Sequence, residues 1–490
     1  MTEEEANHLR EANAHLKEAL ARAERRIEEV EGRLMSAMLR IEELERRLAK
    51  DSHNSSKPPS SDGFTRKVRS RPKSAKPSGG QRGHQGHALL QVAEPDQVLI
   101  HRPDQCAGCS ASLMEIPGQV TERRQVHELP PLHLIVIEYQ VETVACPTCG
   151  HRTSGSFPVG VEAPAQYGPQ MQALAVYLSQ FQLLPLARVR ELVADLWGGQ
   201  LSEGTIARWV AEAAQILAPR MDMLKQWLVA SRLNHVDESG IRVKGLLRWM
   251  HVILTKWLTL YSWHPKRGQE AIDAIGVLPQ YQGRAMRDRW HSYDHYSCQQ
   301  SLCGAHLLRD CLFVAEQEKR PWAAAMYELL LQMKKTTDVF REQGAKAVPP
   351  PERDALVLQY FEVLQRGFTE HGALALPPPG PAPKKSGRKK QSASKNLLDA
   401  LLTRAEQVLA FLDDLSIPFT NNQAERDLRM IKVQQKISGT FRSEQGATAF
   451  CALRSYLSTM RKQGRPMLAA LTAVFEGSPF PIAWEPGRAL

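Results

Sequence analysis

The feature that most limits how this chain can fold is the order of its apolar segments between residues 233 and 288. Runs rich in alternating apolar residues at 233–243, 247–255 and 258–264 predict three strands. A helix-like segment follows at residues 269–277, and a short strand-like piece at residues 283–287 comes after it. Three strands, a helix, a strand and then further helices predict a mixed β-sheet with helices on both faces.

Three acidic residues lie where this pattern suits metal ligands. Asp237 is in the first predicted strand, Asp288 follows the fourth, and Glu425 lies in Thr-Asn-Asn-Gln-Ala-Glu-Arg at residues 420–426. In that segment Thr420 can cap a helix and Gln423 can complete a capping box. Carboxylates from two strands and a helix can hold two Mg²⁺ ions, or Mn²⁺ in their place, on either side of one phosphodiester. Because the chain has 53 acidic residues, spacing alone is a weak indication.

Each of the three acids has an acidic neighbour that competes for its role, namely Glu238, Asp294 or Asp427. Side chains alternate across a strand, so only one of Asp237 and Glu238 can point at a metal. Two residues on a helix are separated by about 200°, so Asp427 should face away from the side that Glu425 occupies.

The predicted glutamate helix also carries donors for phosphate oxygens. Asn421, Glu425 and Arg429 share one helical face, and other donors lie close to it. A face that combines a metal ligand with such donors suits DNA strand transfer. The DNA contacts predicted here are Asn421, Asn422, Arg426, Arg429 and Lys432.

Two Cys-x-x-Cys knuckles indicate a zinc ribbon at residues 91–160. Cys106 and Cys109 form the first knuckle, Cys146 and Cys149 the second, and the alternating segment 134–142 between them predicts a strand. Four thiolates complete a tetrahedral Zn²⁺ shell, which indicates one structural ion with no role in chemistry. Disulfides are the alternative use of these cysteines.

Residues 1–50 predict a coiled-coil helix that forms a homodimer, since a heptad pattern of apolar a and d positions runs through them. The only polar residue in the seam is Asn13, at an a position, where a buried asparagine favours two strands in one register. The alternative is a lone amphipathic helix on the core of the protein. The a positions are Asn13, Leu20, Ile27, Leu34, Ile41 and Leu48, and the d positions are Leu9, Leu16, Ala23, Val30, Ala37 and Leu44.

Residues 51–90 are rich in Ser, Gly, Pro and basic residues and predict a flexible basic linker. Residues 161–229 are helical in pattern. Helices at 187–197 and 202–214, with Ser202 as N-cap and glycines between them, follow the order of a helix-turn-helix. Its second helix would offer Arg208 to a major groove, and an ordinary helical hairpin is the alternative.

The remaining segments surround the predicted sheet. The catalytic core would occupy residues 230–310 and 416–465, divided by a helical insertion at 311–415, with a C-terminal tail at 466–490. The helical periodicity at 322–371 gives way to a Pro- and Lys-rich loop at 377–395. A bare linker of that length inside a domain would be unusual.

The bulk properties favour a polyanionic partner. The net charge is +10 and the pI is near 9.2, which suits DNA or RNA. No run of 18 apolar residues is present, so no membrane span is expected. The acidic N-terminus lacks the order of charges and apolar residues in a signal peptide.

Five strings in the sequence resemble the DDE transposases of insertion-sequence family sixty-six. They are Val-Asp-Glu-Ser-Gly-Ile-Arg-Val-Lys-Gly (236–245), His-Pro-Lys-Arg-Gly-Gln-Glu-Ala (264–271), Leu-Cys-Gly-Ala-His-Leu-Leu-Arg (302–309), Thr-Asn-Asn-Gln-Ala-Glu-Arg-Asp-Leu-Arg (420–429) and Lys-Ile-Ser-Gly-Thr-Phe-Arg-Ser (436–443). The second acidic motif departs from the family pattern, because Asp-Gly-aromatic is replaced by Asp288-Arg289-Trp290.

The resemblance implies a multidomain α+β protein with a ribonuclease-H-like catalytic domain, in which Asp237, Asp288 and Glu425 hold the metal ions. It also implies a bacterial, cytoplasmic transposase that cleaves the terminal inverted repeats of its element and joins them to target DNA, with or without accessory proteins. Cys303 and His306 resemble Cys-x-x-His pairs that follow the second aspartate in several DDE families, and we expect them to support the site. The alternatives are a structure-specific nuclease of the same fold and a non-catalytic zinc-ribbon DNA-binding regulator.

Overall fold

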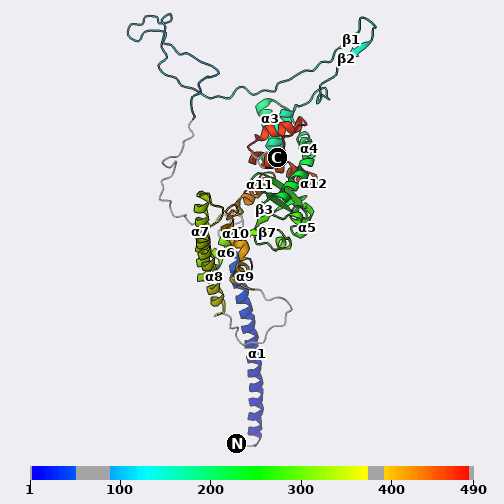
Figure 1. Cartoon of the computed structure of the whole chain (residues 1–490). Helices are drawn as coiled ribbons and strands as arrows, with labels where there is room; N and C mark the ends of the chain where they lie inside the picture. Colours follow the sequence, from blue (N-terminus) through cyan, green and yellow to red (C-terminus); the bar gives the residue numbers. More distant parts are fainter. Residues whose placement is uncertain (1–2, 51–53, 55–88, 373–390, 485–490) are drawn as a thin grey trace. The chain divides into compact units, whose positions relative to one another are not determined.

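The computed structural model describes residues 3–50, 54, 89–372 and 391–484 (Figure 1). Contacts divide the chain into two units. Within the described residues, the larger unit contains the N-terminal helix, Gln140–Glu191 and everything from Leu201 onward. The smaller unit contains the residues from 89 to Tyr139 together with Leu192–Gln200. Most of the linker predicted at 51–90 and of the loop predicted at 377–395 lies outside the described residues.

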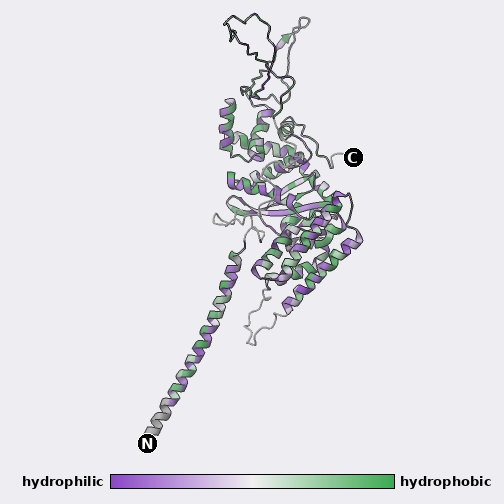
Figure 2. Ribbon diagram, turned by 90° about the vertical axis from the view of Figure 1, so that its left-hand side faces the viewer, coloured by the Kyte–Doolittle hydropathy of each residue, from purple (hydrophilic) through white to green (hydrophobic). Residues whose placement is uncertain are grey.

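The first helix, α1 (Glu3–Leu48), is continuous, and hydrophobic and hydrophilic residues alternate along it (Figure 2). Its heptad side chains do not pack on a core of the same chain. Leu20, Ile27 and Leu34 are 61%, 57% and 59% exposed. The helix itself is therefore confirmed, and the described heptad side chains are exposed. Pairing with a second copy stays a prediction.

Five strands form the main sheet, in the order β5-β4-β3-β6-β7. The antiparallel part joins the first three strands, and β6 and β7 continue from β3 as parallel strands. The mixed sheet predicted from the sequence is confirmed, and the four strands predicted for it are present with ends within one residue of the prediction. The strands are β3 (Leu233–Val243), β4 (Leu246–Leu254), β5 (Thr259–His264), β6 (Arg284–Arg287) and β7 (Gln299–Leu302).

Two hydrophobic cores lie along this sheet. The antiparallel strands pack Ile241, Met250 and their neighbours against Leu428 of α11 and Phe450 of α12. The parallel strands contribute Met286 and other side chains to a second core with helices α6 to α10. These helices are α6 (Gly304–Gln317), α7 (Pro321–Glu342), α8 (Pro350–Gly372), α9 (Ala393–Thr403), α10 (Ala405–Asp413), α11 (Asn422–Ser438) and α12 (Glu444–Lys462).

The predicted helical insertion is therefore part of the packed core of the parallel strands. Its helix α9 begins at Ala393, so the basic loop ends earlier than the predicted residue 395. The reason is local capping, since the Ser392 hydroxyl accepts the Lys395 N–H at 3.1 Å and starts the helix. The short α5 (Gln269–Ile275) connects the antiparallel and parallel parts of the sheet.

The helices before the sheet are α2 (Pro169–Val176), α3 (Leu186–Trp197) and α4 (Glu203–Ala230), with a π-helical turn at Tyr177–Phe181. The predicted cap is confirmed, because Ser202 Oγ accepts the Thr205 N–H at 3.0 Å. However, α4 runs well past the predicted end at residue 214 and through Pro219. Leu217, Leu224 and Leu228 are fully buried along it, so tertiary packing outweighs the helix-breaking effect of the proline.

Two further expectations are corrected. No strand forms at residues 134–142, and the hairpin strands β1 (Thr143–Ala145) and β2 (Arg152–Ser154) pair instead. A strand requires a hydrogen-bonded ladder, and strand pairing begins only at Thr143, opposite Ser154, with one further bond from the Gly155 N–H to Glu142 O at 3.0 Å. The predicted C-terminal tail contains helix α13 (Met467–Phe475), because apolar residues such as Leu471 and Val474 are fully buried.

None of the helices in the described part of the chain is long and apolar enough to span a membrane.

Candidate active site

The parallel pairing of β3 and β6 brings two of the predicted metal ligands side by side. His235 is aligned with Met286, and two more residues along each strand lead to Asp237 and Asp288. Each carboxylate is oriented by one backbone donor. Asp237 Oδ1 accepts the Glu238 N–H at 2.8 Å, and Asp288 Oδ1 accepts the Trp290 N–H at 2.9 Å. The sheet therefore sets the positions of both aspartates.

Glu425 joins the aspartates from the first turn of α11. The pKa of Asp237 is consistent with this approach. Burial raises the pKa of Asp237 well above its usual range, and the negative charges of Glu238, Asp288 and Glu425 add to the increase. Like charges raise a carboxyl pKa only when they lie close in a poorly solvated place. The three predicted acids are thus gathered in one region of the fold.

The start of α11 differs from the predicted capping box. Thr420 is not the cap; Asn421 is, and no side chain caps the helix there. Asn421 is 2% exposed, and its amide donates to Val236 O at 2.9 Å while its Oδ1 lies 2.8 Å from His235 Nδ1. This side chain ties α11 to β3 one residue before Asp237. Both ends of the amide are used inside the fold, and the DNA contact by Asn421 stays a prediction.

The three competing carboxylates are paired with basic groups. Glu238 binds Arg267 at 2.7 Å, and Asp427 lies 3.4 Å from Lys462 Nζ. Asp294 binds two arginines, Arg287 at 2.5 Å and Arg404 at 2.6 Å. Within the described residues, no ion pair forms at Asp237 or Asp288. The competing acids have basic partners, and the two aspartates have no ion-pair partner within the described residues.

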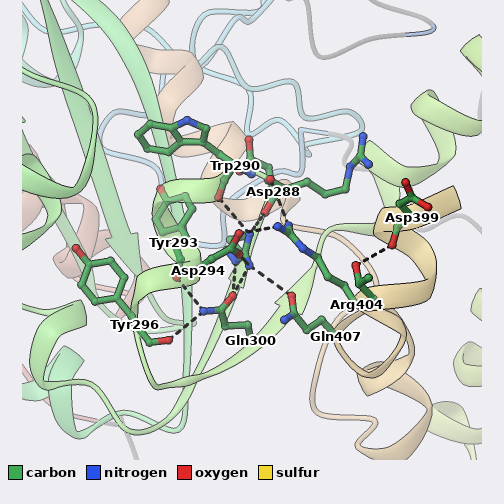
Figure 3. Close-up of polar contacts among 12 residues, drawn as sticks. Asp288, Trp290, Tyr293, Asp294, Tyr296, Gln300, Asp399, Arg404 and Gln407 are labelled. Atoms are coloured by element: carbon green, nitrogen blue, oxygen red, sulfur yellow. Dashed lines mark hydrogen bonds and ion pairs between the residues drawn. The ribbon is translucent and has the colours of Figure 1, made fainter. Parts of the chain in front are cut away.

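The loop after Asp288 lies in a network of polar contacts that includes Asp294, Gln300 and Arg404 (Figure 3). Arg287 is fully buried and donates to the backbone oxygens of Asp288 at 2.9 Å and Trp290 at 3.3 Å. It also contacts Gln300 of β7 and Gln407 of α10. Because Arg404 and Gln407 come from the helical insertion, the insertion helps to fix the loop that carries Asp288.

Arg289, the departure from the family pattern, is also paired. Its guanidinium donates to Asp310 of α6 at 2.6 Å, and both side chains are about 30% exposed or less. The positive charge that replaces glycine is therefore compensated by a carboxylate outside the acidic cluster.

Cys303 and His306 lie next to Glu425. Their ligand atoms and that of Glu425 lie within 4.8 Å of one another. Cys303 Sγ accepts the Asn421 N–H at 3.1 Å, and burial raises the pKa of its thiol to about 11, so it remains a neutral thiol. Burial lowers the pKa of His306, and so does the charge of Arg309. Cys303 therefore holds the first residue before α11, and the supporting role of His306 stays a prediction.

Sequence reasoning missed a second group beside Glu425. Arg309 Nη2 lies 3.5 Å from Glu425 Oε1, and His306 Nδ1 lies 3.7 Å from the same oxygen. Neither distance is that of a good hydrogen bond, and this oxygen has no hydrogen-bond partner among the described residues. The spacing His306-x-x-Arg309 on one helical face was the available signal.

The other DNA-contact predictions have different surroundings. Asn422, Arg426 and Arg429 are exposed on α11 and stay predictions. Lys432 is partly buried and donates to Gly240 O at 2.5 Å, so it already has a structural partner. Arg208 is 67% exposed on α4, where it lies 3.6 Å from Glu212.

Each cysteine knuckle forms a tight turn that favours thiolate. In the smaller unit, Ser110 N–H donates to Cys106 O at 2.8 Å, and backbone amides of Gly108 and Cys109 lower the pKa of the Cys106 thiol. In the larger unit, amides of Cys149 and Thr148 lower the pKa of Cys146 in the same way. Amide donors that favour the anionic sulfur are the environment that a zinc ligand requires.

Comparisons with known proteins first identify the class of protein. Residues 103–150 match the zinc-finger binding domain of transposase IS66, which supports a structural zinc at the knuckles. Residues 164–449, more than half of the chain, match the family described as Transposase IS66 family, and the chain belongs to this family. The resemblance drawn from the sequence strings is thereby confirmed.

Two further similarities cover other parts of the chain. Residues 2–89 match a family of unknown function (DUF6444). The chain is also 23% identical over 410 residues to the uncharacterized protein y4jD of Sinorhizobium fredii. The match covers 78% of this chain and 76% of that protein.

We expect Cys106→Ser or Cys149→Ser to lose the zinc and unfold the knuckle region, because zinc binding contributes about 10–16 kcal/mol of folding free energy in zinc-finger peptides. Metal analysis of purified protein should find about one zinc per chain. His101→Ala and His151→Ala, which change histidines beside the knuckles, serve as controls and should keep the metal. Folded protein without zinc would contradict this assignment.

The uncompensated charge at Asp237 predicts an unusual stabilising substitution. When folding raises the pKa of an acid, the protein loses stability as the pH rises from the unfolded pKa of that acid, about 3.9, through its folded pKa. Asp237→Asn removes that cost, about 1.4 kcal/mol for each unit by which the pKa is raised. Urea denaturation at pH 7 of zinc-loaded protein, without added Mg²⁺ or Mn²⁺, should show the gain.

The matched control for this prediction is Asp294→Asn. It leaves Arg287 and Arg404 without their carboxylate and should destabilise the protein by about 1–3 kcal/mol. If both substitutions destabilised the protein equally, Asp237 would be an ordinary buried polar residue.

Proposed function

We propose that this transposase cleaves the ends of its element and joins them to target DNA through a two-metal DDE mechanism in a ribonuclease-H-like domain. Asp237, Asp288 and Glu425 would hold two Mg²⁺ or Mn²⁺ ions. The observation that carries the proposal is the difference in pairing: the neighbouring acids have basic partners, and Asp237 and Asp288 have none among the described residues. Oxygen donors of this kind are those that Mg²⁺ prefers.

In this proposal the acidic residues would bind the metal ions, and arginines of α11 would bind DNA. When bound, the ions supply a nucleophile at neutral pH and stabilise charge on the phosphodiester. The two aspartates, fixed by the β3–β6 register, would hold the ions at the sheet, and Glu425 would complete the shell from α11. The exposed Arg426 and Arg429 of the same helix would contact DNA phosphates, which positions the strand without reading its sequence.

Asp237→Asn, Asp288→Asn and Glu425→Gln should each abolish metal-dependent cleavage of a terminal-repeat substrate, because each removes charge from the metal shell. DNA binding, measured separately by gel shift, should be largely retained. Glu444→Gln is a matched control, since Glu444 also lies in the first turn of a helix but pairs at the surface with Lys244. Wild-type cleavage by any one of the three variants would remove that residue from the proposal.

The products distinguish the alternatives. A transposase joins the cleaved 3′ end to a target duplex, whereas a structure-specific nuclease of the same fold would release ends without joining them. A chain that binds the repeat and never cleaves it with either metal would be a non-catalytic regulator.

We also propose that α1 makes the protein a parallel homodimer, so that one active site serves each end of the element. The support is the exposed heptad stripe, which has the composition of a coiled-coil seam and packs on no core of its own chain. An exposed apolar stripe of this length marks an interaction surface. In a parallel pair, Arg26 would face Glu31 of the second copy, and Arg40 would face Glu45.

Leu20→Glu combined with Leu34→Glu should abolish the dimer, because both a positions would place like charges in the seam. Arg25→Glu, at an outward-facing f position of the same helix, serves as the control and should leave the dimer intact. Light scattering gives the mass of each variant. Equal masses for the wild type and the double variant would show that assembly resides elsewhere in the protein.

A further inference from the structure

Arg267 lies in the short link between β5 and α5 and contacts residues next to both aspartates of the acidic cluster. Its Nε and Nη2 atoms donate to Glu238 Oε1 at 2.9 and 2.7 Å. Its guanidinium also lies over two indole rings, 4.8 Å from the centroid of Trp249 and 4.2 Å from that of Trp290. A planar guanidinium can make both kinds of contact at once, and a lysine ammonium cannot.

On one side, Arg267 controls the charge beside Asp237. The Glu238 side chain is 1% exposed, so its carboxylate cannot rely on water for compensation. Arg267 saturates Oε1, and the Tyr293 hydroxyl donates to Oε2 at 2.5 Å. Every strong acceptor of Glu238 is therefore engaged, and this carboxylate is kept from acting as a ligand in place of its neighbour.

On the other side, Arg267 supports the residue that orients Asp288. The backbone N–H of Trp290 donates to Asp288 Oδ1, and the indole of Trp290 packs under the guanidinium and against the edge of Tyr293. The same tyrosine binds Glu238. One arginine thus connects the flanks of two aspartates that come from different strands.

We propose that Arg267 is a positioning residue of the active site, which neutralises Glu238 and holds Trp290 so that Asp237 and Asp288, and not Glu238, face the metal ions with Glu425. This inference deepens the proposed function and rests on it for the identity of the reaction. Arg267 would contact neither the substrate nor the metal ions. Its effect is transmitted by the charge of Glu238 and by the position of Trp290.

A charge cycle of Arg267→Gln, Glu238→Gln and the double variant tests the proposal, with Mn²⁺ binding and terminal-repeat cleavage as separate measurements. Arg267→Gln releases a negative charge next to Asp237, so Mn²⁺ should bind at least as tightly as in the wild type. Cleavage should nevertheless fall by about 100-fold, the scale expected when reacting groups are misplaced by about 1 Å. Glu238→Gln alone leaves an unpaired positive charge and should weaken Mn²⁺ binding.

The double variant restores the net charge of the pair. It should recover cleavage to within about tenfold of the wild type. The remaining loss would come from the missing contacts between the guanidinium and the two indole rings. Arg267→Lys keeps the charge but loses the planar fork, so its cleavage should lie between that of wild type and Arg267→Gln. Arg353→Gln, which breaks an exposed ion pair between Arg353 of α8 and Asp413 of α10, is the control and should leave both measurements unchanged.

The outcomes separate this inference from the proposed function. If Arg267→Gln loses stability, Mn²⁺ binding and cleavage together and the double variant recovers none of them, Arg267 has a general structural role and the inference is wrong. The inference is also wrong if Arg267→Gln cleaves like the wild type. If the wild type itself shows no metal-dependent cleavage, the proposed function fails, and unchanged Mn²⁺ binding across the charge cycle would overturn the inference independently.

Discussion

The central constraint in this structure is the repulsion between carboxylates that the fold holds close together. The parallel β3–β6 register places Asp237 and Asp288 side by side, and Asn421 ties α11 to β3 so that Glu425 approaches them. Burial and these like charges raise the pKa of Asp237. Such an arrangement is unfavourable for the isolated protein, and it persists because the surrounding sheet and helices determine each position. Strain of this kind is typical of sites that a ligand completes.

The neighbouring charges are arranged to keep that repulsion local. Arg267, Arg287 and Lys462 each neutralise one competing acid, and the fully buried Arg287 also holds the backbone of the Asp288 loop. Arg404 at the start of α10 adds a contact from the insertion. The insertion is therefore a structural part of the acidic site, although more than a hundred residues separate its helix α10 from Asp288 along the chain. Removing it would expose a buried arginine as well as an apolar core.

The sequence predicted most strands because strands depend on local pattern. The acidic trio was only weakly indicated by its spacing and depended on the resemblance to the family. The alternation of 233–243 is sufficient to indicate β3, and it also separates Asp237 from Glu238. Features set by tertiary contact were missed. Strand β7, Gln299–Leu302, begins with two glutamines and shows little apolar alternation, so only its pairing with β6 makes it a strand. The expected cap of α11 was wrong because Asn421 bonds to Val236 and His235 in place of its own helix.

The single departure from the family pattern follows the same rule of charge balance. An arginine beside a metal ligand would weaken cation binding if its charge faced the ions. Arg289 instead forms a 2.6 Å ion pair with Asp310, one turn beyond His306 on α6, so its positive charge is compensated by a carboxylate. A glycine at this position would need no such partner. In the proposed metal site, Asp310 is therefore the residue that keeps the charge of Arg289 away from Asp237 and Asp288.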